Sequence, residues 1–600
     1  MARLAPRGFV WVLIGLAVAA IGFELGVRDV VTANEGQRAT PPAEMLRSGD
    51  FVIPTLNGVD YLAKPPLLYW AIAAVYGLTG VVSPLTARIP GALAAAGLVL
   101  SAYLLSRRRA GEPVARWAAL TLLASPYFLE RARWAQLDIP LALAVFVAIA
   151  LARSACDAEG ARRAVAFSLG SGLALAAALM LKGPPALLFL WTGWLAHSVV
   201  AARLPGRVLR LGVYWALAAL GIELALTLVR WAVPSVGSWI RAPVPLILLG
   251  IAWTAAAWRG GGVARARDTR LWLLALGTGL ILAAPWAVAV LVRKGWPYVS
   301  ALLFEQVFER TYTASEINSG SPLYYLIALP VLLAPWGLLL PFHFSRDQWR
   351  EHASAYRYAV VMAWSSTVAF SLLAGKEYEY VLPAVPFFLI ATAHHLAGIE
   401  QPDRPAWIAR WTHVWLRAMV VLLAVLAAGA AVYGTIVCPR LRLAAEIWPV
   451  AVAVVAAAVI LFRRRRFPLA CVFAMALAAM AGGVLVRDHH DTGLRSPKGV
   501  GELAGRLGRA GYPVEATKVY PAFAFYAQHP IREQTEPETV LSRLAGDAPY
   551  FYVTQERLFE QYIAPTLGER VQVFTSPHTK RGLILIGNVP LPAVPGPPGE

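Results

Sequence analysis

Long apolar windows recur along almost the whole chain, and they constrain its fold more than any other feature. A helix that crosses about 30 Å of hydrocarbon needs roughly 17 to 25 such residues. Candidate windows lie near 8–27, 88–106, 114–130, 137–155, 164–181, 183–200, 211–229, 243–258, 271–292, 322–341, 357–374, 380–398, 416–436, 445–462 and 467–486. These windows predict an all-α polytopic membrane protein with about 13 to 15 transmembrane helices.

Composition and charge exclude an ordinary soluble enzyme and a disordered chain. The chain is 58% hydrophobic and 15% charged, whereas soluble domains are roughly 45 to 50% apolar and 25% charged. A formal net charge of +19 would suit nucleic acid, but the basic residues form short clusters between the apolar windows. Such clusters are typical of membrane topology signals, so we expect membrane lipids and no nucleic acid as partners.

The distribution of arginine and lysine predicts the orientation in the membrane. We interpret segment 67–82 as an interfacial helix, because counting it as a span would reverse every later loop. The arginine clusters, such as 107–109 and 463–466, then lie on the cytoplasmic side together with the N-terminus. The other side carries all seven lysines: Lys64, Lys182, Lys294, Lys376, Lys498, Lys518 and Lys580. This pattern predicts a multi-pass plasma (inner) membrane protein whose polar loops are periplasmic or extracellular.

The composition changes after Arg487 and predicts a separate domain. Segment 500–512 is typical of an amphipathic helix, and segments 518–527, 549–555 and 582–589 of strands. We therefore expect a transmembrane domain over 1–486, with 28–87 as an external catalytic loop that carries interfacial helices. A periplasmic, soluble α/β domain would follow over 487–590, and the Pro/Gly-rich residues 591–600 would form a disordered tail.

The first external loop contains the first two candidate site residues. At roughly sixty residues it is too long for a passive connector. Glu35, with Arg38 close by, is interpreted as a carboxylate that acts as general base or orients an acceptor; a solvated loop acid is the alternative. Lys64 precedes two prolines and an aromatic stretch, so its ammonium would lie near the headgroups, either binding a lipid phosphate or simply snorkelling.

A second group of candidates lies at the outer ends of later windows. Asp138, in RARWAQLDIP, is an ionisable residue just inside a window, with Arg131 and Arg133 near enough in sequence to be its partners. A purely structural Asp/Arg pair is the alternative. Lys182 and Lys376 lie in two other outer loops, and the segment between them adds further charged residues, Glu305 and Arg310. Cations beside aromatic residues suit a phosphate-sugar or diphosphate headgroup.

No metal or nucleotide motif is evident in the sequence. The three cysteines show no CxxC spacing and indicate neither a disulfide framework nor a thiolate metal site; they are Cys156, Cys438 and Cys471. His489 and His490 could bind zinc, although a hydrated interfacial cluster is the favoured interpretation. No P-loop, glycine-rich nucleotide motif or HExxH is found. The sequence requires no cofactor and leaves a divalent metal ion open.

Several of these segments, in order, resemble the bacterial GT-C membrane glycosyltransferases. They are EMLRSGDFVIPTLNGVDYLAKPPLLYW, TARIPGALAA, RARWAQLDIP, LKGPPAL, FEQVFER leading to PLYYLIALPVLLAPWGLLLP, and GKEYEYVLPAVP. The relatives nearest in pattern are the lipid A aminoarabinose transferases and the dolichyl-phosphate-mannose protein mannosyltransferase family. The similarity covers roughly residues 8 to 400. It implies the GT-C fold and transfer, with inversion, of a sugar from a polyprenyl (undecaprenyl) phosphate donor on the outer face.

The resemblance also implies roles for individual residues. The family's acidic pair reads Asn34-Glu35 here, so only Glu35 can serve as an acid, with Asp138 as the second catalytic candidate. The family's phosphate-contacting lysine matches Lys64, and a later family lysine and tyrosine match Lys376 and Tyr380 less securely, because Glu377 and Glu379 intervene. Lys64, with help from Lys182 or Lys376, would bind the phosphate of the donor. Further substrate contacts are expected from Arg38, Tyr61, Tyr69, Arg131, Glu305, Arg310 and Tyr380. The acceptor is left open among lipid A, another glycolipid, a wall polymer and protein.

Three other functions compete with this interpretation. A lipid-linked sugar flippase or transporter would use the same cations to line a path, but it predicts ionisable residues near the middle of spans. An oligosaccharide ligase would need a larger polar acceptor surface, which the C-terminal domain could supply. A degenerate member that only binds polyprenyl lipid is kept open by Asn34.

Overall fold

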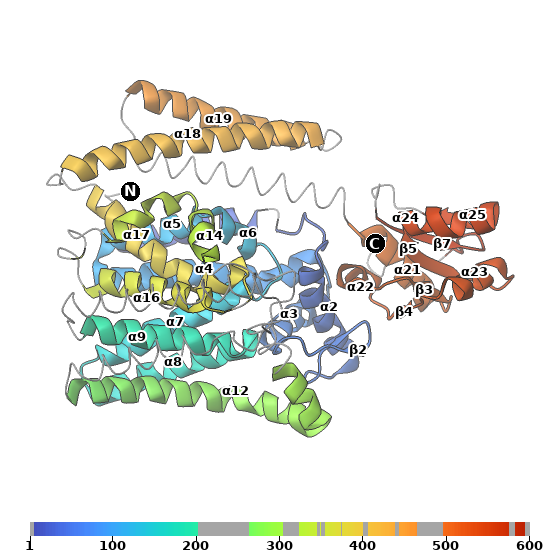
Figure 1. Cartoon of the computed structure of the whole chain (residues 1–600), viewed down its shortest axis with the longest axis horizontal. Helices are drawn as coiled ribbons and strands as arrows, with labels where there is room; N and C mark the ends of the chain where they lie inside the picture. Colours follow the sequence, from blue (N-terminus) through green and yellow to red (C-terminus); the bar gives the residue numbers. More distant parts are fainter. Residues whose placement is uncertain are drawn as a thin grey trace, which may run out of the picture.

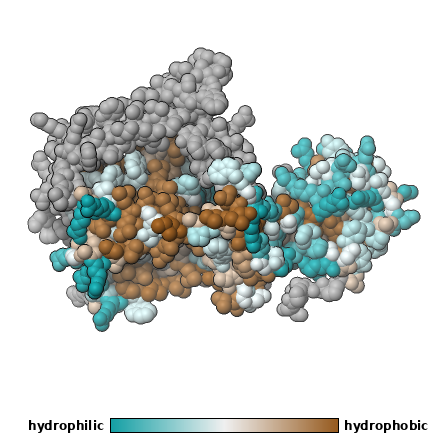
Figure 2. Space-filling model, turned by 90° about the horizontal axis from the view of Figure 1, so that it is seen from below, coloured by the Kyte–Doolittle hydropathy of each residue, from teal (hydrophilic) through white to brown (hydrophobic). Residues whose placement is uncertain are grey.

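The computed structural model describes residues 5–23, 25–201, 263–303, 323–344, 349, 354–373, 375–399, 406–437, 443–464, 496–574 and 582–593. The windows predicted near 211–229, 243–258 and 467–486 lie outside these residues. The described chain forms a bundle of helices with a small α/β unit beyond one end (Figure 1). In Figure 2, apolar side chains cover much of the visible bundle face, whereas polar side chains dominate the α/β unit.

The helices of the bundle match the predicted windows closely. Five stretches in the described part are long and apolar enough to cross a membrane: Pro84–Ala110, Asp138–Cys156, Ala161–Lys182, Ala266–Pro297 and Tyr378–Gly398. They belong to α4 (Pro84–Ala110), α7 (Asp138–Cys156), α8 (Ala161–Lys182), α12 (Val263–Leu303), and η4 (Tyr378–Ala384) with α17 (Val385–Ile399). Other helices in the bundle are α1 (Pro6–Gly22), α9 (Pro185–Ala201), α16 (Ser354–Ser371), α18 (Ala406–Val437) and α19 (Leu443–Arg464). The predicted polytopic helical membrane fold is confirmed.

Two windows that were predicted as single helices are broken, and there the prediction is wrong. The first divides into α5 (Glu112–Leu123) and α6 (Pro126–Ala132), and the second into α14 (Tyr324–Leu332) and the 3₁₀ helix η3 (Trp336–Phe344). Pro126 and Pro335 lie at the breaks. Proline has no N–H to donate and disfavours helical geometry in the residue before it, so each helix ends there despite continuous apolar sequence.

The segment predicted to be the first external loop folds into two short helices and a hairpin: α2 (Ala33–Ser48), β1 (Thr55–Leu56), β2 (Val59–Asp60) and α3 (Leu67–Thr79). At 13 residues, α3 is about 20 Å long, too short to cross the hydrocarbon, as an interfacial helix should be. The hairpin turn places Asn57 and Gly58 at positive φ, the usual choice for a two-residue turn. The buried Glu44 carboxylate accepts hydrogen bonds from the Asn57 and Gly58 N–H groups, at 2.8 and 3.2 Å, and fixes the turn to α2.

The C-terminal α/β unit contains a five-stranded mixed sheet in the order β4-β3-β5-β7-β6. Its strands are β3 (Val514–Ala516), β4 (Arg532–Glu533), β5 (Phe551–Gln555), β6 (Gln572–Phe574) and β7 (Leu583–Gly587). The helices are α21 (Lys498–Arg509), α22 (Pro521–Ala527), α23 (Pro537–Ala545), α24 (Glu556–Leu558) and α25 (Ala564–Leu567), with η5 (Phe559–Ile563) and η6 (Gly568–Arg570) between or after them. β3 pairs in parallel with β4 and β5, whereas β7 is antiparallel to β5 and β6.

The structure confirms three of the four elements predicted in this unit. The amphipathic helix is α21, and the last two strands are β5 and β7. The strand predicted over 518–527 is wrong, because Pro521 begins the helix α22 there. Its apolar run is buried by packing against α21 rather than by strand pairing: Gly501 and Gly505 let the α22 backbone approach closely. The exact limits of the predicted domains stay a prediction.

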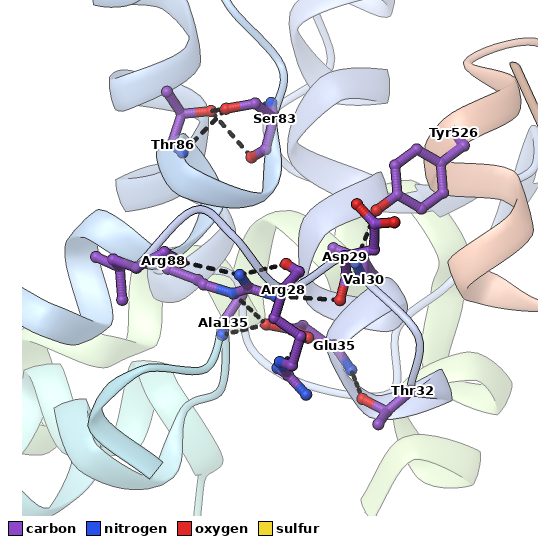
Figure 3. Close-up of polar contacts among 11 residues, drawn as sticks. Arg28, Asp29, Val30, Thr32, Glu35, Ser83, Thr86, Arg88, Ala135 and Tyr526 are labelled. Atoms are coloured by element: carbon purple, nitrogen blue, oxygen red, sulfur yellow. Dashed lines mark hydrogen bonds and ion pairs between the residues drawn. The ribbon is translucent and has the colours of Figure 1, made fainter. Parts of the chain in front are cut away.

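The C-terminal unit docks on α2 of the first external loop. The Val30 N–H donates to the Tyr526 hydroxyl at 2.7 Å, and Asn57 exchanges two hydrogen bonds of 2.8 Å with the backbone of Ile531. α2 also approaches α22 so closely that a Cβ on Gly36 would lie 2.4 Å from the Ala522 nitrogen. Two segments almost 500 residues apart in sequence are thus joined by direct contacts (Figures 1 and 3).

Candidate active site

Glu35 is the centre of a buried ion-pair network rather than a solvated loop acid (Figure 3). Its carboxylate is fully buried and pairs with Arg28 at 2.6 Å and with Arg88 at 2.8 Å. The Ala135 N–H donates to the same carboxylate at 3.1 Å. Arg88 also donates to backbone carbonyl oxygens of the 25–29 segment. One side chain therefore joins α2, α4, the segment after α1 and the segment before α7.

The surroundings of Glu35 determine its charge state. Burial alone would raise the pKa of Glu35, but the Arg88 and Arg28 guanidinium groups and the hydrogen bonds outweigh it and lower the pKa below its usual range. A general base close to neutral pH needs a raised pKa and an open path to the acceptor. The geometry therefore favours a positioning role for Glu35 over proton transfer, and its catalytic role stays a prediction.

Trp134 joins this network to a second polar cluster. The Arg28 guanidinium lies 4.3 Å from the centre of the Trp134 ring, and the Arg131 guanidinium lies 4.8 Å from it. Both cations therefore contact the same aromatic side chain, in the short segment between α6 and α7. A cation over an aromatic face is attracted to it by about 0.5 to 2 kcal/mol.

The second cluster, called here the Asp138 cluster, comprises Arg131, Asp138, Lys182, Glu379 and Tyr380. The Lys182 ammonium pairs with Asp138 at 2.6 Å, and Arg131 pairs with Glu379 at 2.8 Å. Lys182 also lies 5.2 Å from the centre of the Tyr380 ring. The two cationic side chains are only 12% and 14% exposed. Four residues predicted for the site from separate loops, Arg131, Asp138, Lys182 and Tyr380, are therefore brought together by the ends of α6, α7, α8 and η4.

The predicted partners of Asp138 need a correction. Arg133 donates to the backbone carbonyl of Phe23 instead, and Arg131 forms its ion pair with Glu379. Arg131 remains close enough to Asp138 for their charges to interact, but the ion pair of Asp138 is with Lys182, at the end of α8. Sequence distance suggested the nearest cations, whereas helix packing provides the partner.

Glu377 adds a further acid beside the cluster. Burial, followed by repulsion from Glu379, raises the pKa of Glu377. Glu130 also interacts electrostatically with Arg131. Carboxylates therefore outnumber the two cations among the described residues of this region, and an anion that approached Lys182 or Arg131 would compete with a carboxylate already paired to it. The arrangement is suited to exchanging ion-pair partners rather than to holding an anion permanently.

Arg38, Tyr61 and Tyr69 also come together, on the external loop. The buried Arg38 donates to the Tyr69 hydroxyl at 2.8 Å, and Tyr61 interacts with the same guanidinium. Lys64 lies on the segment between these tyrosines and is partly buried. The predicted substrate contacts of this loop are thus neighbours, and their roles stay predictions.

The remaining predicted residues lie elsewhere. The buried Lys376 ammonium donates to the backbone carbonyls of Phe370, at 3.3 Å, and Ser371, at 2.7 Å, at the C-terminal end of α16. Lysine at that position is stabilised by the exposed carbonyls of the helix end, so its contacts favour a structural role over donor binding. Glu305 and Arg310 lie outside the described residues.

One group of side chains among the described residues could hold a metal ion. Cys156, His197 and Asp268 place one ligand atom each within 4.8 Å of one another. This group lies at the opposite end of α7 from Asp138, about 27 Å away for 19 residues of helix. Sequence spacing did not indicate it, because the three residues are far apart in the chain. It is too distant to serve chemistry at the Asp138 cluster.

Arg28, Arg88 and Glu379 are the site residues that sequence analysis missed as candidates. Arg88 carried a usable signal: it is an arginine in an apolar helix, where a charge is costly and usually has a function or a partner. Arg28 and Glu379 carried no such signal, because an arginine after a span and an acid in a loop are ordinary. Both residues become site candidates only through ion pairs with residues of other elements: Arg28 with Glu35, and Glu379 with Arg131.

Comparison with known proteins supports the resemblance seen in the motifs. A family model described as dolichyl-phosphate-mannose-protein mannosyltransferase matches residues 63–231. The undecaprenyl phosphate-alpha-4-amino-4-deoxy-L-arabinose arabinosyl transferase 2 of Pseudomonas fluorescens is 32% identical over 203 residues, 32% of this chain and 33% of that protein. The corresponding transferase of Shewanella sediminis is 24% identical over 383 residues, 63% of this chain and 58% of that protein. These alignments span between a third and three fifths of the relatives' length.

The fold has a counterpart among solved structures. The crystal structure of ArnT from Cupriavidus metallidurans bound to undecaprenyl phosphate aligns with 99% of this chain and 100% of its own, with a TM-score of 0.67 and 20% identity. The apo structure of the same protein aligns with a TM-score of 0.66. At this level of identity the likeness establishes the overall fold, including the C-terminal unit.

Proposed function

We propose, on the premise that this chain is a GT-C-type membrane protein resembling the aminoarabinose transferases, that it is a membrane glycosyltransferase. It would move a sugar from a polyprenyl (undecaprenyl) phosphate donor to an acceptor on the outer face of the plasma membrane, with inversion at the anomeric carbon. The observation that carries the proposal is the Lys182–Asp138 ion pair at 2.6 Å beside the Arg131–Glu379 pair.

The cations of the Asp138 cluster are suited to stabilise a departing phosphate. When the bond between the anomeric carbon and the phosphate oxygen breaks, the donor's phosphodiester gains one negative charge. Lys182 and Arg131 are nearly buried, where water screens a charge poorly and an interaction with a developing anion is strong. Because both cations are paired before the donor arrives, the phosphate would take over Lys182 and release the Asp138 carboxylate.

The released carboxylate supplies the second half of the reaction. The acceptor oxygen forms a bond to the anomeric carbon on the face opposite the phosphate, and Asp138 accepts its proton when the acceptor is a hydroxyl. A phosphate acceptor needs no strong base, so Asp138 would then orient it. Lys64 is proposed to contact the donor phosphate from the external loop, with Arg38 and the two tyrosines beside it in the substrate-binding surface.

The acceptor and the orientation are also part of the proposal. The distribution of lysine and arginine among the loops supports a site on the periplasmic or extracellular side. The candidate acceptors are a lipid such as lipid A, another glycan and a protein. The C-terminal unit packs on α2 at the same end of the bundle (Figure 1), so it would border the route by which an acceptor reaches the site.

The test is a transfer assay with purified protein in lipid, radiolabelled undecaprenyl phosphate sugars and a membrane extract. We expect release of free undecaprenyl phosphate and movement of label to an acceptor. Lys182→Gln should abolish release, and Asp138→Asn should reduce it while donor binding is kept. Lys518→Gln, on the exposed surface of the C-terminal unit, is the matched control and should transfer like the wild type.

The same assay can refute the proposal. Transfer by Lys182→Gln at the wild-type rate would exclude Lys182 from phosphate stabilisation. Failure to release undecaprenyl phosphate from any donor, together with protein-dependent movement of labelled lipid between leaflets, would indicate transport instead. Binding of donor without turnover, in wild type and control alike, would indicate a protein that only binds polyprenyl lipid.

A further inference from the structure

A cavity lies between α4, α7, α16 and α17, at the end of α7 opposite to Asp138. Its walls are mostly apolar, with residues such as Leu105, Ala150, Phe387 and Ile390. Two arginines, Arg109 and Arg153, interrupt this lining, together with Ser106 and Tyr358. Neither the resemblance nor the proposed transfer reaction uses this end of the bundle.

Arg153 is buried and forms no ion pair of its own among the described residues, because the nearby acid Asp157 pairs with Arg109. It is 6% exposed, and its Nη2 makes one long hydrogen bond, at 3.5 Å, to the Ser354 hydroxyl. Its guanidinium lies 3.9 Å from the centre of the Tyr358 ring, and its Nε has no hydrogen-bond partner in the part of the chain that the structure describes. A buried cation without an anion of its own is costly, and a cation–π contact offsets only part of that cost.

Arg109 and Ser106 add unused polar atoms to the same lining. One Arg109 nitrogen pairs with Asp157 at 2.5 Å and another donates to the Ser154 hydroxyl at 3.2 Å. The Arg109 Nε and the Ser106 hydroxyl are buried and make no hydrogen bond to any described residue. Among the described residues of this lining and their ion-pair partners, two arginines face one acid, Asp157, which leaves one formal positive charge unbalanced. The residues that line this cavity thus carry one excess positive charge and three buried polar atoms without a described hydrogen-bond partner: Arg153 Nε, Arg109 Nε and Ser106 Oγ.

We propose that this cavity binds the phosphate group of an anionic ligand, with Arg153 and Arg109 as its donors. A phosphodiester carries one negative charge and unshared oxygens, which balances the excess charge and satisfies the free N–H and O–H groups. The apolar walls would contact the chain of a lipid whose headgroup enters the cavity. Arginine clusters of the sequence place this end on the cytoplasmic side, where anionic phospholipid headgroups are accessible. Free phosphate has the same chemistry and is the second source.

The test compares ligands on delipidated full-length protein, with thermal unfolding and native mass spectrometry as measurements. The probes are dioleoylphosphatidylglycerol, phosphate-free dioleoylglycerol and inorganic phosphate. We expect phosphatidylglycerol to bind and to raise the unfolding temperature, with an affinity about tenfold or more weaker in Arg153→Gln, because a charge-assisted hydrogen-bond partner is lost. Arg162→Gln, an exposed arginine that follows α7 in the chain, is the control and should bind like the wild type.

The outcomes separate the sources. Inorganic phosphate alone could raise the unfolding temperature as much as phosphatidylglycerol does. If this rise is lost in Arg153→Gln, the site is assigned to free phosphate. The proposal is overturned if phosphatidylglycerol binds wild type and Arg153→Gln equally, or if dioleoylglycerol binds as well as phosphatidylglycerol. Should Arg153→Gln fail to fold, Arg109→Gln provides the same comparison at the other cation, which is 14% exposed.

Discussion

Replacing Glu35 by glutamine tests whether the buried network holds the external loop in place. Glu35→Gln keeps the shape of the side chain and removes its charge. An amide oxygen can still accept from Arg88 and from the Ala135 N–H, at the positions now 2.8 and 3.1 Å away. The amide nitrogen would then face the Arg28 Nη2 atom, now at 2.6 Å, so two donors would meet and two buried cations would lose their anion.

The expected loss of stability follows from burial. Arg28 and Arg88 are each 1% exposed, and Glu35 is 0% exposed. Removing one partner of a buried ion pair costs about 3 to 5 kcal/mol, because it leaves an uncompensated charge. Glu112→Gln is the matched control: Glu112 also pairs with two arginines, Arg107 and Arg116, but its side chain is 24% exposed. Arg107 is 45% and Arg116 12% exposed, so solvent screens this network more than that of Glu35, and a solvent-screened pair contributes about 0 to 1 kcal/mol.

The assay is equilibrium unfolding in mixed micelles with a rising fraction of SDS, followed by circular dichroism. We expect Glu35→Gln to lose about 3 to 5 kcal/mol in the free energy of unfolding and Glu112→Gln to lose less than about 1 kcal/mol. Adding Arg28→Gln to Glu35→Gln removes one of the two uncompensated cations and should recover part of the loss. A Glu35→Gln variant as stable as the Glu112→Gln control would refute the reasoning.

Three further predictions concern the junction with the C-terminal unit. Gly36→Ala should destabilise the protein and lower transfer, because the added Cβ would lie 2.4 Å from backbone atoms of α22. Gly15→Ala is the control, because its Cβ would meet no described atom within 4 Å, and it should change neither property. Unfolding and transfer assays of both variants test this difference. Asn57→Ala removes two hydrogen bonds of 2.8 Å between the hairpin and the C-terminal unit. If the docking loses roughly 1 kcal/mol, proteolysis between the unit and the bundle should become about fivefold faster. An unchanged cleavage rate would contradict the docking role of Asn57. Burial, together with nearby arginines such as Arg509, lowers the pKa of His529 below 6.5. The imidazole of His529 therefore binds a proton more readily in the unfolded chain, and the free energy of unfolding should decrease as pH falls below about 6.5. Unfolding at pH 7.5 and 5.5 measures this decrease. An equal decrease in His529→Gln would contradict the assignment to His529.

The sequence predicted the helical architecture well because membrane spans are encoded locally. An apolar window of sufficient length has few alternatives to a helix in lipid, so α7 and α8 match their windows within three residues. Prediction failed where one residue overrides composition, as at Pro126. It also failed at α22, where aromatic residues that favour strands are buried by packing on glycines of α21.

The candidate site was predicted as a set of residues but not as a set of contacts. The residue types and motifs identified Asp138 and Lys182 separately, and neither local pattern shows that they form one ion pair. The burial of Glu35 could not be predicted from the sequence either, because its partner Arg88 lies 53 residues away in the chain, on α4. Pairing across helices depends on how the bundle packs, which a single sequence does not display.

The hydrogen bond between Val30 and Tyr526 has a consequence for synthesis. Its two ends are 496 residues apart, and a ribosome adds about 5 to 20 residues per second. The surface of α2 is therefore uncovered for about 25 to 100 s after α2 is translated, until α22 has been synthesised. During that time the growing chain exposes the uncovered surface of α2, so quality-control proteases that can reach this surface should attack stalled or truncated chains preferentially.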